Sequence, residues 1–110
     1  MLRGEIWWGV YPNDTSGKKR PLLIVSHDSI NKSKGQDIIV VKVTSLIKSD
    51  GTKRYVNKYY DVVVHLKNPS VIKTSAIYTT LKSNLNGRYR TLSTTQMSLV
   101  DDALRNALDL

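Results

Sequence analysis

Hydrophobic residues fall into short runs along the first two-thirds of the chain, and polar, turn-forming stretches separate these runs. This pattern predicts the short strands of a small barrel or sandwich. The expected strands are Glu5–Tyr11, Leu22–Val25, Ile38–Val43, Val62–Leu66, Val71–Thr79 and Arg88–Leu92. The Asn86-Gly87 pair is a strong turn signal, so we expect the turn between the last two strands there.

Two of these runs lack polar alternation. Leu22–Val25 is entirely apolar, and Ile38–Val43 has Lys42 as its lone charge. Such runs are typical of strands that are buried on both faces, so we expect this pair at the centre of the barrel. The polar, lysine-rich stretch 49–60 follows, and we expect it to be mobile.

A helix is predicted at the end of the chain. Ser93 and Gln96 have the spacing of a capping box, in which each side chain bonds the other residue's backbone N–H. Apolar residues then recur at spacings of three and four, at Met97, Val100, Leu104, Ala107 and Leu108. One helix face should therefore pack on the barrel. No linker or repeat interrupts the chain, so we expect one mainly β domain, residues 1–110, with a C-terminal helix.

The charge balance favours a polyanionic partner. Seventeen Lys and Arg against nine Asp and Glu give a net charge of +8. This charge favours nucleic acid as the partner over a membrane surface. No apolar run approaches the length of about 18 residues that spans a membrane, and the first residues lack the apolar stretch of a secretion signal. We therefore expect a cytoplasmic protein without a membrane association.

Several kinds of chemistry have no support in the sequence. The absence of cysteine excludes disulfides, thiolate catalysis and cysteine-ligated zinc. His27 and His65 are isolated from one another and from any metal-binding motif. Gly17-Lys18 lacks the second glycine of a phosphate loop, and no Gly-x-Ser-x-Gly motif occurs. We expect neither a metal ion nor a small-molecule cofactor.

Cleavage of a phosphodiester remains, because RNA carries its own nucleophile and needs mainly positioning and charge stabilisation. Arg20 is the best candidate, since it begins a buried strand and Pro21 fixes the backbone behind it. Thr44 and Ser45 end the other central strand, where their hydroxyls could contact the same phosphate. The alternatives are a surface salt bridge for Arg20 and turn-forming hydrogen bonds for the two hydroxyls.

The aromatic residues suggest a surface for single-stranded RNA, which stacks its bases on such rings. The chain has two Trp and six Tyr but no Phe. Four tyrosines lie in or near predicted loops, namely Tyr11, Tyr55, Tyr59 and Tyr78. One of Trp7 and Trp8 must point inward if their strand alternates.

Three segments carry a recognisable pattern: Arg3–Trp8, Lys19–Ser26 and Val40–Ser45. Together they resemble the MazF/PemK toxin family, and the resemblance continues through Pro69–Ile72 and Leu92–Leu110. It implies an SH3-like small barrel with a C-terminal helix, as in MazF and CcdB, and a homodimer. It also implies metal-independent, sequence-selective cleavage of single-stranded RNA, usually messenger RNA, and a cognate antitoxin protein that covers the active groove.

The same resemblance assigns roles to residues. Arg20 matches the catalytic arginine of the family, and Thr44 matches its catalytic threonine or serine. Ser45 follows as a phosphate or base contact, and the loop 13–19 matches the segment that gates the groove. The remaining expected substrate contacts are Tyr11, Ser16, Gly17, Lys18, Lys19, His27 and Tyr78.

One departure affects the mechanism. The Asp-Gln-Ile-Arg-Thr segment of many relatives is Ser75-Ala76-Ile77-Tyr78-Thr79 here, so the acid and the second arginine are both absent. His27, Tyr78 and water are the alternatives for the base. The rival hypothesis is a toxin or nucleic-acid-binding module without catalysis on the same barrel, such as a gyrase-directed poison resembling CcdB.

Overall fold

Six strands form one antiparallel sheet in the computed structural model, which describes all 110 residues. They are β1 (Glu5–Gly9), β2 (Arg20–Ile24), β3 (Asp37–Ser45), β4 (Asp61–His65), β5 (Pro69–Leu81) and β6 (Leu85–Thr91). Their order across the sheet is β4-β5-β3-β2-β1-β6. The central position predicted for the two continuous apolar runs is confirmed, because they are β2 and β3.

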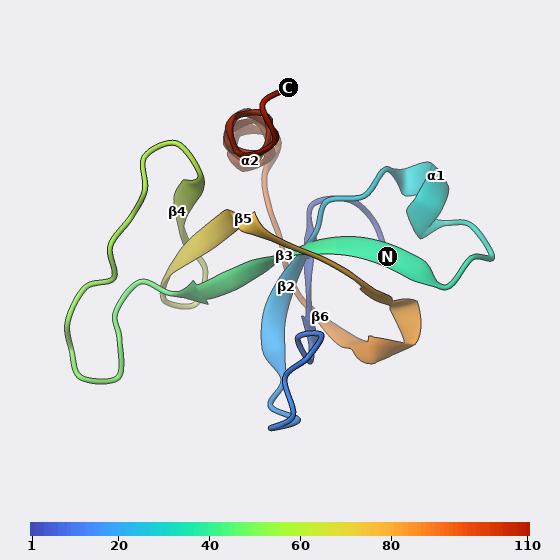
Figure 1. The fold of residues 1–110 in the computed structure, drawn as a ribbon, viewed down its shortest axis with the longest axis horizontal. Coiled ribbons are helices and arrows are strands. Elements are labelled where there is room, and N and C mark those ends of the chain that lie inside the picture. Colours follow the sequence, from blue (N-terminus) through green and yellow to red (C-terminus); the bar gives the residue numbers. More distant parts are fainter.

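The sheet twists into a barrel-like shape whose two edge strands, β4 and β6, do not pair with each other (Figure 1). Helix α2 (Thr94–Leu108), seen end-on at the top of Figure 1, packs against β4 and β5. The predicted class, mainly β with a C-terminal helix on a small barrel, is confirmed in this arrangement.

The capping box predicted for the helix is present, with the Ser93 hydroxyl and the Gln96 side chain each accepting the other's backbone N–H. Val100 and Ala103 are the buried residues of α2. Leu108, expected on the same face, is 51% exposed, because at 100° per residue it lies about 80° around the axis from Val100. No helix of the chain has the length and apolar character needed to cross a membrane.

The interior has two apolar clusters, one on each side of β3. The larger joins Val41 and Val43 to α2, and the smaller contains Ile38 and Val40 of β3. Because side chains alternate along a strand, Lys42 and Thr44 continue the face of Val40, away from α2. The second face of β3 therefore changes from apolar to polar toward its C-terminal end.

The prediction of a turn at Asn86-Gly87 is wrong. The chain reverses earlier, in the 3-10 turn η1 (Lys82–Asn84), and β6 then pairs with β1 rather than β5. Gly87, at φ +91°, lies inside β6 where the register with β1 shifts. A positive φ suits a β-bulge as well as a hairpin turn, and the bulge is what forms here. Short helix α1 (Asp28–Asn31) was also not predicted.

The start of the polar stretch after β3 folds back on that strand, at the left of Figure 1. Ile47 and Lys53 form an isolated antiparallel bridge, and the Arg54 N–H donates to the Leu46 carbonyl at 2.8 Å. The residues 46–54 are thus a small hairpin, which we call the β3 hairpin. Mobility of the stretch 49–60 stays a prediction.

Candidate active site

Two adjoining hollows, of about 440 and 300 Å³, have Arg20, Thr44 and Arg54 in common among their lining residues. Arg20 is the first residue of β2, Thr44 is the penultimate residue of β3, and Arg54 ends the β3 hairpin. The fold therefore brings the two residues predicted to be catalytic to one place. We call these three side chains the shared wall.

Arg20 is held by its backbone and left largely free at its side chain. It pairs with Gly9 of β1, while its side chain remains 39% exposed. Its Nε lies 3.8 Å from Asp14 Oδ2, which is too long for a hydrogen bond. Its Cζ lies 5.7 Å from the ring centre of Tyr11. The guanidinium can therefore present its fork to a ligand.

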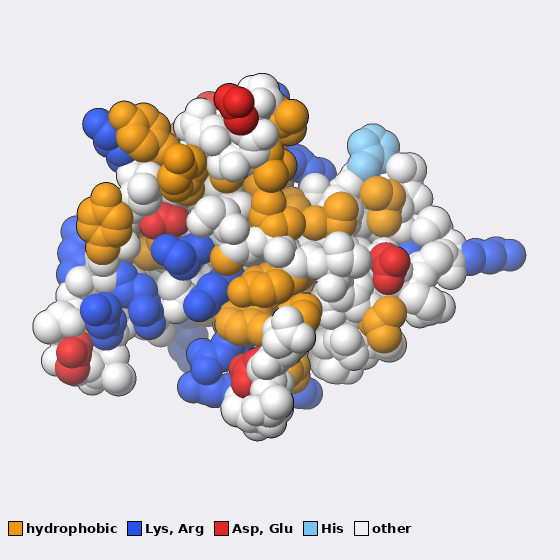
Figure 2. All heavy atoms as spheres, in the orientation of Figure 1, with side chains coloured by type: hydrophobic (Ala, Val, Ile, Leu, Met, Phe, Trp, Pro, Cys, Tyr) orange, Lys and Arg blue, Asp and Glu red, His pale blue; other side chains and the backbone are white.

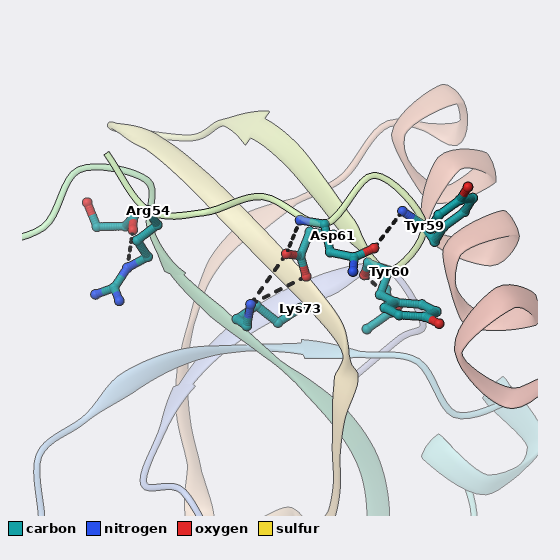
Figure 3. A network of polar contacts seen from close by, with 8 residues as sticks. Arg54, Tyr59, Tyr60, Asp61 and Lys73 are labelled. Carbon is teal, nitrogen blue, oxygen red and sulfur yellow. Dashed lines mark hydrogen bonds and ion pairs between the residues drawn. The ribbon is translucent and has the colours of Figure 1, made fainter. Parts of the chain in front are cut away.

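Arg54 was not among the residues predicted for the site. Its Nε donates to the Ser45 carbonyl at 2.7 Å, as Figure 3 shows. The terminal nitrogens of Arg54 make no hydrogen bond or ion pair within the chain. No local signal marks Arg54, because its place depends on how the β3 hairpin folds back.

Lys42 lines the smaller hollow with the shared wall. It stands two residues before Thr44 on the same face of β3 and has neither a hydrogen bond nor an ion pair within the chain. Lys73 of β5 lies opposite Lys42 in the sheet, but it has an ion pair. Its Nζ lies 3.4 Å from the buried Asp61 carboxylate (Figure 3). Burial, followed by the charges of Arg54, Arg20 and Lys73, lowers the pKa of Lys42.

An aromatic pair lines the smaller hollow. Tyr11 and Tyr78 stack with ring centres 5.6 Å apart and planes at 17°. The Tyr11 hydroxyl donates to the Val43 carbonyl at 3.2 Å, and burial raises the pKa of Tyr11 to about 12. Tyr11 therefore stays protonated at neutral pH and offers its ring rather than a base. Both residues were predicted as substrate contacts.

A second aromatic pair lines the larger hollow. Trp8 and Tyr89 have ring centres 4.7 Å apart. The two tryptophans point to opposite faces of β1, as predicted. Trp7 points inward, where it packs on the smaller apolar cluster and its indole N–H donates to Glu5, and Trp8 is left to line the larger hollow. Tyr55 and Tyr59 line neither hollow.

The predicted loop contacts divide into two groups. Lys18 lines the larger hollow together with Ser45, whereas Ser16, Gly17 and Lys19 line neither. The loop is shaped by hydrogen bonds from the Ser16 N–H to Asp14 Oδ1 at 2.9 Å and from the Lys18 N–H to Ser16 Oγ at 3.2 Å.

His27 lies apart from the shared wall. It precedes α1, where its Nδ1 accepts the Ser29 N–H at 3.0 Å, and it lines a different hollow with Arg3 and Asp101. The unpredicted helix α1 carries it there. Ser75, where the resemblance leads one to expect an acid, is exposed and lines neither of the two hollows. The structure thus brings no histidine to this site.

The two hollows form a cationic surface. Their lining includes four Lys and Arg side chains, and Asp14 is the sole carboxylate. Figure 2 shows blue side chains gathered at the lower left, over the β3 hairpin and the strand ends near the β1–β2 loop. No three His, Cys, Asp or Glu side chains converge anywhere in the chain. Such a surface suits a phosphate ester, with rings on both sides for bases.

Comparison with known proteins places the chain in a family. Residues 2–108 match the family described as the PemK-like, MazF-like toxin of type II toxin–antitoxin systems. The chain belongs to this family. The predicted resemblance to MazF/PemK toxins is therefore confirmed over almost the whole length.

Individual relatives agree with the family match. The endoribonucleases MazF2 of Mycobacterium bovis and MazF6 of Mycobacterium tuberculosis are each 30% identical over 117 residues, which is 100% of this chain and 98% of theirs. A mycobacterial endoribonuclease solved with its cognate antitoxin has a TM-score of 0.76 at 23% identity, over 100% of this chain and 96% of that one. The structure of MazE–MazF from Deinococcus radiodurans has a TM-score of 0.69 at 17% identity, and the match covers 100% of this chain and 97% of that one. The solved structures share the fold.

Proposed function

We propose that this protein is a toxin endoribonuclease that cuts single-stranded RNA, chiefly messenger RNA, at selected sequences and without a metal ion. The observation that carries the proposal is the shared wall of Arg20, Thr44 and Arg54 between two hollows that each contain an aromatic pair. Family membership supports this function over a gyrase-directed or purely binding role, since its relatives include endoribonucleases.

In the proposed reaction the shared wall holds the scissile phosphate. Arg20 donates two hydrogen bonds to the phosphoryl oxygens and stabilises the charge that develops on them. The Thr44 hydroxyl fixes the phosphate, and Arg54 supplies a second guanidinium. The 2′-hydroxyl attacks in line, so the products end in a 2′,3′-cyclic phosphate and a 5′-hydroxyl.

The flanking nucleotides would occupy the hollows. One base stacks on the Tyr11–Tyr78 pair and another lies beside Trp8 and Tyr89, because stacking holds single strands without regard to base pairing. Ser45 and Lys18 contact the adjacent backbone from the larger hollow. The loop residues Ser16, Gly17 and Lys19 help select the sequence.

The partners follow from the same proposal. The family is one of paired toxins and antitoxins, and solved relatives include complexes with an antitoxin. We therefore assign this chain a cognate antitoxin protein that covers the cationic hollows, and a homodimeric state. The site of action is the cytoplasm, where messenger RNA and antitoxin are both present.

The test is to incubate the purified protein with a long single-stranded RNA in EDTA and to map both new ends by sequencing. Discrete cuts with cyclic-phosphate ends are expected, and Arg20→Ala should lower the rate by about two to three decades, the usual scale for one charge-stabilising donor. Arg105→Ala on α2 is the matched control, since it removes an arginine outside both hollows. Intact RNA with folded protein, or full activity in Arg20→Ala, would reject the proposal.

A further inference from the structure

The proposed cleavage needs a proton for the departing 5′-oxygen, and the fold limits which group can supply it. Arginines do not give up protons near neutral pH. Asp14 is held ionised, because hydrogen bonds from the Ser16 side chain and backbone lower its pKa. Tyr11 uses its hydroxyl on the Val43 carbonyl. His27 lines another hollow.

Lys18 of the larger hollow lies on the exposed loop between β1 and β2. Two proton-bearing side chains of the smaller hollow remain, Lys42 and Tyr78. Tyr78 has its ring stacked on Tyr11. Lys42 has its Nζ 5.5 Å from the ring centre of Tyr11, the same ring that Arg20 approaches at 5.7 Å. Lys42 also shares its face of β3 with Thr44. The ammonium group thus lies beside the shared wall, in contact with the Tyr11 ring but without a hydrogen bond or an ion pair.

Lys42 has a cation–π contact with the Tyr11 ring but no carboxylate to neutralise its charge. It lies partly buried within an otherwise apolar run, where a charge without an ion partner is unfavourable. The only carboxylate of the two hollows, Asp14, lies toward Arg20, and the carboxylate of Asp61 is engaged by Lys73. A bound phosphodiester would supply the missing anion.

We infer that Lys42 is the general acid of the RNA cleavage, an assignment that rests on the function proposed above. As the 2′-oxygen forms its bond to phosphorus and the bond from phosphorus to the 5′-oxygen breaks, Lys42 Nζ gives one proton to that oxygen. The 2′-hydroxyl proton leaves to water. The neutral amine then takes a proton from solvent, so no proton is gained or lost overall.

The surroundings of Lys42 favour proton donation. Burial on β3 lowers its pKa, and the cations Arg54 of the β3 hairpin, Arg20 of β2 and Lys73 of β5 lower it further. A lowered pKa makes the ammonium a stronger acid than an exposed lysine and brings it nearer to the working pH. Tyr11, Tyr78 and Asp14 are the other titratable groups of this hollow.

The test compares two short RNAs that span a mapped cut site, one natural and one with sulfur in place of the bridging 5′-oxygen. A thiolate leaves without a proton, so only the natural RNA needs a general acid. Lys42→Arg keeps the positive charge, but an arginine cannot give up a proton to the leaving oxygen. It should slow single-turnover cleavage of the natural RNA by about 100-fold or more, the scale of general acid catalysis, and leave the sulfur RNA close to the wild-type rate.

The controls separate the possible failures. Lys34→Arg, an exposed lysine outside both hollows, should behave as wild type on both RNAs. If Lys42→Arg equals wild type on both, or slows both equally while keeping its melting temperature, Lys42 is not the acid although the proposed function stands. The same holds if Tyr78→Phe alone slows only the natural RNA. If wild type leaves the long RNA intact, so that no cut site can be mapped, the proposed function itself fails, and this inference falls with it.

Discussion

Asp14 Oδ2 and Arg20 Nε lie 3.8 Å apart across the base of the loop between β1 and β2. This distance allows attraction between the charges without a hydrogen bond. Asp14 meanwhile accepts the Ser16 N–H at 2.9 Å through its other oxygen. The carboxylate thus shapes the loop and competes with any anion that approaches Arg20.

Removing the charge of Asp14 while keeping its turn should strengthen RNA binding. Asn can still accept the Ser16 N–H, so Asp14→Asn isolates the charge. We expect RNA affinity to rise by about 1.5- to fivefold at low salt, the range for one exposed ion pair. The measurement is fluorescence anisotropy with an RNA that carries 2′-deoxyribose at the cut site. Asp14→Ala is the comparison, since it also loses the turn, and an affinity unchanged in Asp14→Asn would contradict the competition.

Arg54 should contribute to RNA binding, although it lies outside the segments that resemble the family. Its terminal nitrogens have no partner in the chain, so a phosphate contact would be lost outright in Arg54→Ala. We expect RNA affinity to fall by about 10- to 100-fold, equivalent to a charged hydrogen bond of about 1.5–3 kcal/mol. The slope of log affinity against log salt should become shallower by about 0.7. Lys53→Ala is the control, because Lys53 lines neither hollow, and equal losses in both variants would refute a specific contact.

The sequence predicted the positions of those residues of the candidate site that depend on single strands. Arg20 and Thr44 lie at the ends of β2 and β3, and these strands are visible as apolar runs. Lys42 was visible too, as the lone charge in a buried strand. Its role could not be predicted, because only the fold shows that it shares a hollow with Arg20 and Arg54 and has no carboxylate partner.

The parts that could not be predicted depend on contacts between distant segments. Arg54 reaches the site through a hairpin whose residues give no strong local signal. Gly87 adopts the positive φ that the Asn-Gly pair favours, but it does so in a β-bulge and not in a hairpin turn. The reason is that β6 pairs with β1, which lies far away in the sequence. The prediction for His27 rests on its chemistry alone, and nothing nearby in the sequence shows that α1 carries it away from Arg20.

Glu5 should make the fold sensitive to acid. Its side chain is 9% exposed, and although burial alone would raise its pKa, hydrogen bonds from the Leu2 N–H, Trp7 and Arg88 hold the pKa below its usual value. A carboxylate with a depressed folded pKa stabilises the protein above its unfolded pKa and loses this contribution as pH falls through the folded pKa. The stabilisation that the Glu5 carboxylate contributes should therefore decline as the pH falls below about 4.3, the usual pKa of Glu.

Thermal melts between pH 7 and pH 3 check this. Glu5→Gln keeps an acceptor for the Leu2 N–H but has no charge, so it should be less stable than wild type at pH 7, with a gap that narrows as the pH falls below about 4.3. Asp37→Asn removes an exposed carboxylate and should leave the acid dependence in place. A gap of constant size across this range would show that Glu5 acts through packing rather than charge.

Gly9 holds β1 close to the start of β6, and this closeness fixes the strand position opposite Arg20. A Cβ there would lie 2.9 Å from the Asn84 carbonyl oxygen and 2.9 Å from Leu85 Cδ2. Because the backbone oxygen cannot yield as a flexible side chain would, Gly9→Ala should destabilise the fold by about 1–3 kcal/mol.

The melting temperature should fall by about 4–8 °C for each kcal/mol lost, and RNA cleavage at lower temperature should fall as well, since Arg20 is displaced along with its partner strand. Gly35→Ala is the matched control. Its added Cβ meets only Ser33 Oγ, at 3.3 Å, and its φ is not positive, so stability should stay within about 0.5 kcal/mol. If Gly9→Ala melts with the wild type, β1 and β6 are not packed as closely as the structure has them, and the positioning of Arg20 must come from the β2–β3 pairing alone.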